Sequence, residues 1–223
     1  MPHLQGIELV PDLTEQVYRR LLAAICSGEL APGTRITQEE LAASLSVSRQ
    51  PVLQALRLLK RDGVVLDAGR RGLAVAPLEP RQIEQVYQVR AVLDGLAARQ
   101  AALAGAKLDR AVIDRGRKAA GAGSVAALIE ADLGFHQLVY RASGNPLIAE
   151  SVDRQWHHIQ RAMGTILQQV PRMRAGVWDE HRAILEAINA GDAARAERLA
   201  QEHCEAAGRS FAEQLAERAP AKA

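Results

Sequence analysis

The chain has 223 residues, of which 48% are hydrophobic and 24% charged, with a formal net charge of +2 and two cysteines. These values are ordinary for one or two globular domains and exclude a disordered, collagen-like or coiled-coil chain. No run of about 18 apolar residues and no signal pattern occurs, and the two cysteines lie far apart, so we expect a cytoplasmic protein with no membrane span and no disulfide framework.

Three short helices are predicted before residue 64, each from a helix-start pattern. Asp12 with Glu15 indicates the start of the first helix, and Thr37 with Glu40 forms a capping box at the start of the second. Ser48 is placed to cap the third. One face of the third helix carries the apolar residues Val52, Ala55, Leu56 and Leu59.

A two-stranded hairpin is predicted after these helices. Short apolar runs at 64–66 and 73–75 flank residues 67–72, which place Arg70 and Arg71 at the tip beside glycines. Three helices followed by a hairpin predict a winged helix-turn-helix domain over residues 1–76. Pro77 and Pro80 interrupt any helix and indicate a linker over 77–80, followed by a second domain over 81–223.

The polar face of the third helix suits contact with DNA. Arg and Gln side chains can form paired hydrogen bonds to guanine and adenine edges in the major groove, and a basic hairpin tip can approach the DNA backbone or minor groove. The alternative for each element is an ordinary solvated surface. The predicted DNA-contacting residues are Arg35, Ser48, Arg49, Gln50, Gln54, Arg57, Arg70, Arg71 and Gly72.

The second domain is predicted to be entirely helical. Six stretches have helical periodicity and are separated by glycines, prolines or polar turns. Six such helices joined by short loops predict an antiparallel bundle, so the fold class is mainly α. The predicted helices span about 81–104, 109–121, 124–142, 146–169, 173–189 and 192–217.

Four polar residues fall on apolar stripes of three of these helices. Asp132 and His136 are four positions apart and therefore share a helix face, while His181 and His203 each lie among aliphatic residues. Burying such groups is costly unless they are paired. One carboxylate and three imidazoles suit a divalent ion such as Zn²⁺, with Ni²⁺ or Mn²⁺ as alternatives. The other interpretation is that the histidines are hydrogen-bonded core residues.

Two further residues are candidates for binding an effector. Arg90 lies on the first bundle helix, and its guanidinium could hold a carboxylate, although a structural ion pair would also explain it. His158 follows Trp156 and His157, and one of these two histidines could line a cavity. Cys204 is predicted to serve packing.

Four motifs of the N-terminal domain form a recognisable set: Gly28 through Gly33, Glu40-Leu41-Ala42, Val47 through Leu56, and Leu59 through Gly63. With these motifs, residues 13–76 resemble the DNA-binding domain of GntR-type bacterial regulators. The resemblance implies that Arg49 contacts operator bases. The sequence departs from the family at Leu53-Gln54, where Arg-Glu is usual, and at Ser46, where glycine is usual.

The helical domain carries a second set of motifs: Val89-Arg90 with Leu93, Asp132 through His136, Ser143-Gly144-Asn145, Glu180-His181-Arg182 and His203. With these motifs, residues 81–215 resemble the FCD ligand-binding domain of the FadR subfamily of these regulators. The resemblance implies that Asp132 and the three histidines hold a divalent ion at the base of an effector pocket. Position 94 carries Asp where the family often has Glu.

Together these features predict a DNA-binding transcriptional regulator that is not an enzyme. We expect a homodimeric repressor on double-stranded operator DNA, released by a small organic acid bound at the metal site. Two alternatives stay open at this point. One is a metal-dependent enzyme fused to a DNA-targeting domain, and the other is a regulator whose metal is only structural or is itself the signal.

Overall fold

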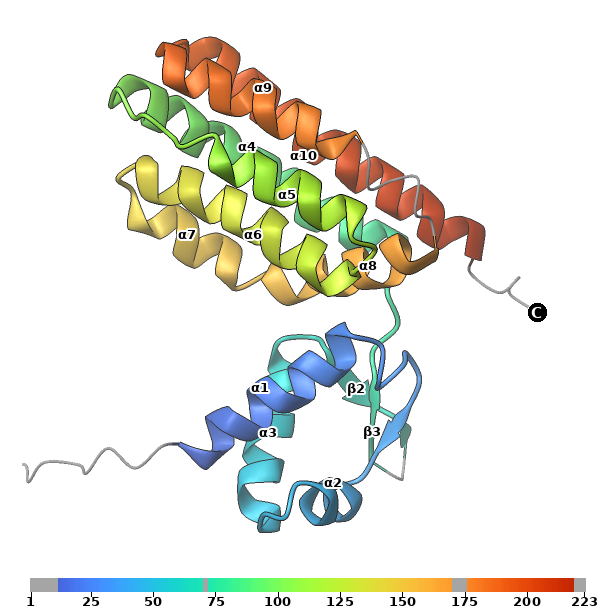
Figure 1. Ribbon diagram of the computed structural model, residues 1–223. Helices are drawn as coiled ribbons and strands as arrows, with labels where there is room; N and C mark the ends of the chain where they lie inside the picture. The colour runs from blue at the N-terminus through green and yellow to red at the C-terminus, as the bar shows by residue number, and fades with distance from the viewer. Residues whose placement is uncertain (1–11, 70–71, 170–175, 219–223) are drawn as a thin grey trace, which may run out of the picture. The chain divides into compact units, whose positions relative to one another are not determined.

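The computed structural model describes residues 12–69, 72–169 and 176–218. The chain divides into two compact units between Pro77 and Leu78, and each is described by itself (Figure 1). Arg70 and Arg71, two of the predicted DNA-contacting residues, lie outside the described residues. Within the described part of the chain, no helix has the length and apolar character needed to cross a membrane.

The N-terminal unit is the predicted winged helix-turn-helix. Its sheet has the antiparallel strand order β1-β3-β2, in which β2 and β3 form the predicted hairpin. Strand β1 was not predicted, because its two residues are too few to show an alternating pattern. The elements are α1 (Leu13–Cys26), β1 (Arg35–Ile36), α2 (Gln38–Ser44), α3 (Arg49–Arg61), β2 (Val65–Asp67) and β3 (Leu73–Val75).

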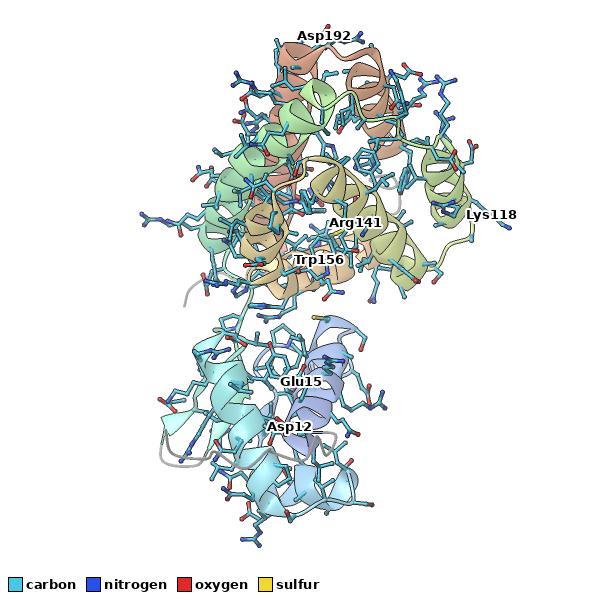
Figure 2. All side chains as sticks on the ribbon, turned by 90° about the vertical axis from the view of Figure 1, so that its left-hand side faces the viewer. Asp12, Glu15, Lys118, Arg141, Trp156 and Asp192 are labelled. Atoms are coloured by element: carbon cyan, nitrogen blue, oxygen red, sulfur yellow. The ribbon has the colours of Figure 1, made fainter. Side chains whose placement is uncertain are left out.

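Two of the three predicted helix caps are present as hydrogen bonds. Asp12, labelled at the start of α1 in Figure 2, accepts from the Thr14 amide at 2.8 Å. Thr37 Oγ1 accepts from the Glu40 amide at 3.3 Å. Ser48 occupies the N-cap position of α3, but its side chain makes no capping hydrogen bond, so this part of the prediction needs correction.

The turn between α2 and α3 contains a strained residue. Ser46 has a φ of 53°, in the left-handed region where a side chain is disfavoured and glycine is not. The strain is the cost of placing the start of α3 directly after α2.

The second unit consists of helices in its described part, as predicted. The predicted helix over 146–169 is wrong in one respect, because the structure ends α7 at Asp153 and begins α8 at Trp156. The apolar pattern continues across the break and no Gly or Pro marks it, so periodicity could not reveal it. The bundle therefore has seven described helices instead of six: α4 (Pro80–Leu103), α5 (Ala111–Gly121), α6 (Val125–Ala142), α7 (Pro146–Asp153), α8 (Trp156–Gln169), α9 (Val177–Ala190) and α10 (Ala193–Arg218).

Glycines allow the two longest helices, α4 and α10, to approach each other closely. A Cβ atom at Gly208 would lie 2.5 Å from Tyr87 Cβ, and one at Gly95 would lie 2.6 Å from Gln201 Cγ. Side chains at these positions would push α10 away from α4. The close packing places Asp94 of α4 beside Cys204 of α10, and this brings both helices to the polar cluster described below.

Candidate metal centre and DNA-binding surface

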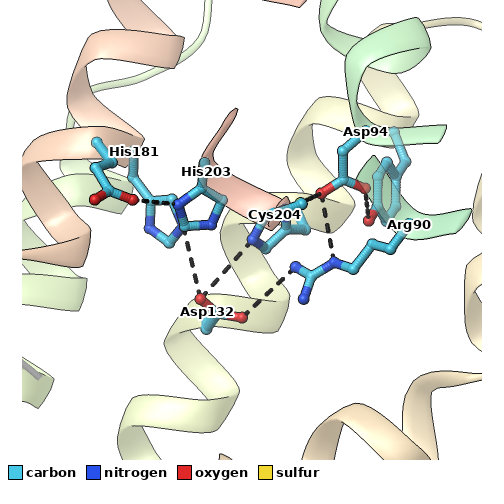
Figure 3. A network of polar contacts seen from close by, with 9 residues as sticks. Arg90, Asp94, Asp132, His181, His203 and Cys204 are labelled. Carbon is cyan, nitrogen blue, oxygen red and sulfur yellow. Dashed lines mark hydrogen bonds and ion pairs between the residues drawn. The ribbon is translucent and has the colours of Figure 1, made fainter. Parts of the chain in front are cut away.

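Three histidines from three helices meet inside the helical unit. His136 comes from α6, His181 from α9 and His203 from α10, and all three are buried. One ring nitrogen from each lies within 4.8 Å of the other two. The Nε2 atoms of His181 and His203 are 3.2 Å apart (Figure 3).

Asp132 joins the same cluster from the turn of α6 that precedes His136. Its Oδ1 atom is 3.6 Å from His181 Nε2 and 3.8 Å from His136 Nε2. The structure therefore brings together the four residues that the sequence predicted as metal ligands, although they lie on helices far apart in the chain.

These donors fit a divalent ion. Two ligands of a tetrahedral Zn²⁺ ion, each about 2.0–2.1 Å from the metal, lie roughly 3.3 Å apart, and the distances of 3.2, 3.6 and 3.8 Å are close to that value. His136 Nε2 is buried and makes no hydrogen bond with the residues that the structure describes. A buried acceptor or donor without a partner is costly, and a bound cation would remove that cost at this atom.

The electrostatics keep two of the imidazoles in the form that binds metal. Burial lowers the pKa of His136, and the Arg90 charge lowers it further, against the opposing effect of Asp94. Burial also lowers the pKa of His181 well below its usual value, with His203 as the next cause. Neutral imidazoles are metal ligands, so these two rings need not lose a proton when an ion binds.

Two carboxylates lie behind the imidazoles. Asp94 Oδ2 is 2.9 Å from His136 Nδ1, and Glu180 Oε2 is 2.6 Å from His203 Nδ1. Asp94 also accepts hydrogen bonds from the Tyr140 hydroxyl and, at 3.0 Å, from Cys204 Sγ. Burial alone would raise the pKa of Asp94, but its interaction with His136, which includes a hydrogen bond, and the Arg90 charge outweigh this effect and hold the pKa below its usual value.

Arg90 is buried next to this cluster and forms ion pairs with two of its carboxylates, since its Nε is 3.4 Å from Asp94 Oδ2 and its Nη2 is 3.9 Å from Asp132 Oδ2. Neither nitrogen makes a hydrogen bond with the described residues. The guanidinium carbon lies 5.4 Å and 5.7 Å from the ring centroids of Tyr87 and Trp156. Arg90 therefore has donors left for a further acceptor.

A small cavity of about 50 Å³ adjoins the cluster. Arg90, Asp132 and His203 contribute to its wall, and the rest of the described wall is apolar or aromatic, as with Tyr87 and Phe211. His158, the other predicted effector residue, is buried with its ring centroid 4.1 Å from that of His157, and it is not among these wall residues.

The predicted DNA-contacting residues that are described lie in the N-terminal unit at exposed positions, except Gln54, which is half-buried. Arg49 begins α3, and its Nη1 is 3.1 Å from Glu39 Oε1 of α2. Leu53 is half-buried on the same helix. The apolar face of α3 is buried in the core, as predicted, while Arg49, Gln50 and Arg57 of the same helix are exposed.

Residues 13–75 match the family described as "Bacterial regulatory proteins, gntR family", and residues 85–206 match the FCD domain. The chain belongs to the GntR family of regulators with an FCD domain. Its resemblance to these two domains, predicted from motifs, is therefore confirmed.

Relatives of this GntR regulator cover both domains. This chain is 30% identical over 195 residues to an uncharacterized HTH-type transcriptional regulator in an unstable DNA locus of Streptomyces ambofaciens. The match covers 85% of this chain and 81% of the relative. This chain is also 28% identical over 198 residues to a probable D-xylose utilization operon transcriptional repressor of Paenarthrobacter nicotinovorans. That match covers 86% of this chain and 85% of the relative.

The fold is also shared with solved structures. The structure of E. coli McbR/YncC superimposes with a TM-score of 0.75 at 22% identity, over 92% of this chain and 99% of that one. The family and these relatives are transcriptional regulators, not enzymes, in agreement with the sequence prediction.

Sequence reasoning missed the supporting residues of the FCD cluster. Asp94, Tyr140 and Glu180 were not predicted to have a role, and Cys204 was predicted to serve packing only. The signal for Asp94 was present, because it lies four positions after Arg90 among small apolar residues of α4. Glu180 is 54% exposed, and although it belongs to the Glu180-His181-Arg182 motif, nothing in that motif shows that its carboxylate reaches His203.

Proposed function

We propose that this GntR regulator is a repressor whose affinity for operator DNA is controlled by a small organic acid bound at a divalent-metal site in the FCD domain. The observation that carries the proposal is the convergence of Asp132 and three buried imidazoles beside Arg90, a buried cation with unused hydrogen-bond donors. We propose Zn²⁺ as the ion, with Ni²⁺ or Mn²⁺ as alternatives, because the donor set is mostly imidazole.

A carboxylate is the effector group that fits these residues. The bound ion would offer a coordination position to a carboxylate oxygen. Arg90 would donate to a second oxygen, since a guanidinium pairs well with a carboxylate. The cavity of about 50 Å³ has room for little more than a water molecule or two, so side chains around it must move for a larger acid.

The proposed regulator acts as a homodimer on a pseudo-palindromic operator. An exposed apolar stripe on α4 supports dimer formation, since Val89, Val92 and Leu103 share one side of that helix and are 48%, 63% and 68% exposed. Effector binding would favour a different placement of the two winged-helix domains, and this requires different effector affinities in the two arrangements.

The proposal is tested in two steps. Selection from random DNA gives the operator sequence, and a thermal-shift screen of organic acids, with and without chelator, gives candidate effectors. Operator binding is then measured against each acid, again with and without chelator. We expect one acid to weaken operator binding only when the metal is present.

Three other results would change the proposal. An acid that acts equally after chelation would make the metal structural. Weaker or stronger operator binding on adding the metal alone would make the metal the signal. Operator binding that no acid and no metal alters would contradict effector control.

A further inference from the structure

The imidazoles of His136 and His203, two of the proposed metal ligands, each face a carboxylate on the side of the ring that points away from the cluster. Nδ1 of His136 is 2.9 Å from Asp94, and Nδ1 of His203 is 2.6 Å from Glu180. In both rings the other nitrogen, Nε2, lies in the cluster: His203 Nε2 is 3.2 Å from His181 Nε2, and His136 Nε2 is 3.8 Å from Asp132 Oδ1.

An ionised carboxylate can only accept hydrogen bonds, so the ring nitrogen that faces it must carry the proton. The nitrogen facing the cluster then keeps its lone pair, which a metal requires. We propose that Asp94 and Glu180 are positioning residues that hold His136 and His203 in the tautomer with Nε2 directed at the ion. This inference rests on the proposed metal function.

Asp94 is itself held in place from two other helices. The Tyr140 hydroxyl of α6 donates to Oδ1, and Cys204 Sγ of α10 donates to Oδ2 at 3.0 Å. All three residues are buried. Cys204 directly follows the ligand His203, so this thiol ties Asp94 to the helix that carries another ligand.

The three imidazoles are supported to different degrees. His136 has a buried, multiply bonded carboxylate, and His203 has Glu180, which is 54% exposed and which water can partly replace. His181 Nδ1 makes no hydrogen bond with the described residues, and its ring stacks on Phe135 with centroids 4.1 Å apart. We therefore expect Asp94 to contribute more to metal affinity than Glu180.

The test is a metal titration of the full chain after the metal has been removed with a chelator. Zn²⁺ affinity is measured by competition with a chromophoric chelator, and Co²⁺ binding by its visible absorption. The variants are Asp94→Asn and Glu180→Gln, which preserve side-chain size and remove charge. The control is Asp179→Asn, an exposed acid next to Glu180 that pairs with Arg117 and Arg182 instead of a ligand histidine.

We expect Asp94→Asn to weaken Zn²⁺ binding about 10–100-fold, the range usual for supporting carboxylates, and Glu180→Gln to weaken it about tenfold or less. Both are expected to change the Co²⁺ absorption band, and the control is expected to leave affinity and band unchanged. The thermal stability of the metal-free variants is measured in parallel, because a purely structural role would lower that stability without altering metal affinity.

If Asp94→Asn does not fold, Tyr140→Phe and Glu180→Gln provide the test. Tyr140→Phe removes one donor to Asp94 and is expected to weaken Zn²⁺ binding severalfold. The inference would be overturned if the parent chain binds Zn²⁺ and both of these variants and the control have affinities within twofold of the parent. That result would leave the proposed metal function standing. A parent chain that binds neither Zn²⁺ nor Co²⁺ would overturn the proposed metal function and, with it, this inference.

Discussion

The two units of this regulator place their functional residues in opposite ways. The core of the winged helix-turn-helix is apolar, and the residues predicted to contact DNA lie mostly on its exposed surface. In the helical unit, the functional cluster is buried. Among the described residues, the buried polar and charged side chains all belong to this second unit: Arg90, Asp94, Asp132, His136, His157, His158, Arg161, His181 and His203.

This difference separates two kinds of substitution. Changing an exposed residue of α3 is expected to alter contacts with DNA and to leave the core intact. Changing a member of the buried cluster leaves its neighbours unpaired and shielded from solvent, so binding and stability are expected to change together. The predictions below test this contrast, beginning with the largest expected effect.

The largest effect is expected from removing a ligand histidine. His181→Ala and His203→Ala should abolish metal binding and effector response while leaving measurable DNA binding, because the winged helix does not contain the site. Unfolding with and without added Zn²⁺ measures the effect: the parent should gain about 2.7 kcal/mol at a hundredfold excess of Zn²⁺ over its Kd, and the variants should gain little.

His157→Ala is the matched control for this prediction. His157 is a buried histidine on α8. Among the described residues, the ring contact of His157 is with His158, which is not one of the proposed metal ligands. It should retain the stabilisation by Zn²⁺. Equal losses of Zn²⁺ stabilisation in all three variants would show that His181 and His203 do not bind the metal.

The next effect concerns Arg49, at the exposed start of α3. Arg49→Ala should weaken binding to the selected operator by about 1–3 kcal/mol and relax sequence preference. Unfolding of the variant should match the parent, since the Glu39 ion pair that it loses lies on the surface. Fluorescence anisotropy with operator and random DNA measures the affinity and the sequence preference. The control is Arg99→Ala, which removes the same charge from the helical unit and is expected to leave operator binding unchanged. Full sequence preference in Arg49→Ala would disprove the assignment.

A smaller effect is expected at Leu53 on α3. Leu53 is half-buried on α3, and we expect it to contact a thymine methyl group or to leave a neutral gap. Leu53→Arg should change base preference at one operator position without unfolding the domain. Selection from random DNA is the measurement, and an unchanged motif would place Leu53 outside the interface.

The smallest effect is expected from relieving backbone strain at Ser46. Since its φ of 53° suits glycine, Ser46→Gly should stabilise the winged helix by up to about 1 kcal/mol. Urea unfolding measures this change, with Ser44→Gly in helix α2 as a control that should instead destabilise. A loss of stability in Ser46→Gly would contradict the interpretation that Ser46 is strained.

Much of the fold could be predicted because local signals agree with it. Asp12 and Thr37 mark helix starts by their own hydrogen bonds, and the apolar faces of α3 and α6 follow helical spacing. Strand β1 and the break between α7 and α8 could not be predicted. A strand of two residues depends on its partner β3, and the break interrupts an apolar pattern without Gly or Pro.

The candidate metal ligands could be predicted for the same reason, because each is a polar residue on an apolar helix face. Their supporting residues depend on tertiary contacts that periodicity does not reveal. Asp94 meets His136 and Cys204 only because α4 packs against α6 and α10, and Gly95 and Gly208 permit the close approach of α10. Glu180 has the sequence pattern of a surface acid and becomes relevant only through its 2.6 Å contact with His203.

The most direct test of a buried metal centre is the metal content of the chain purified without an affinity tag, measured by elemental analysis. The account predicts about one equivalent of a divalent metal per chain in the parent and its loss in His203→Ala. Less than about a tenth of an equivalent in the parent, together with an undiminished effector response in His203→Ala, would contradict the metal-centred account, while the assignment to the GntR family would stand.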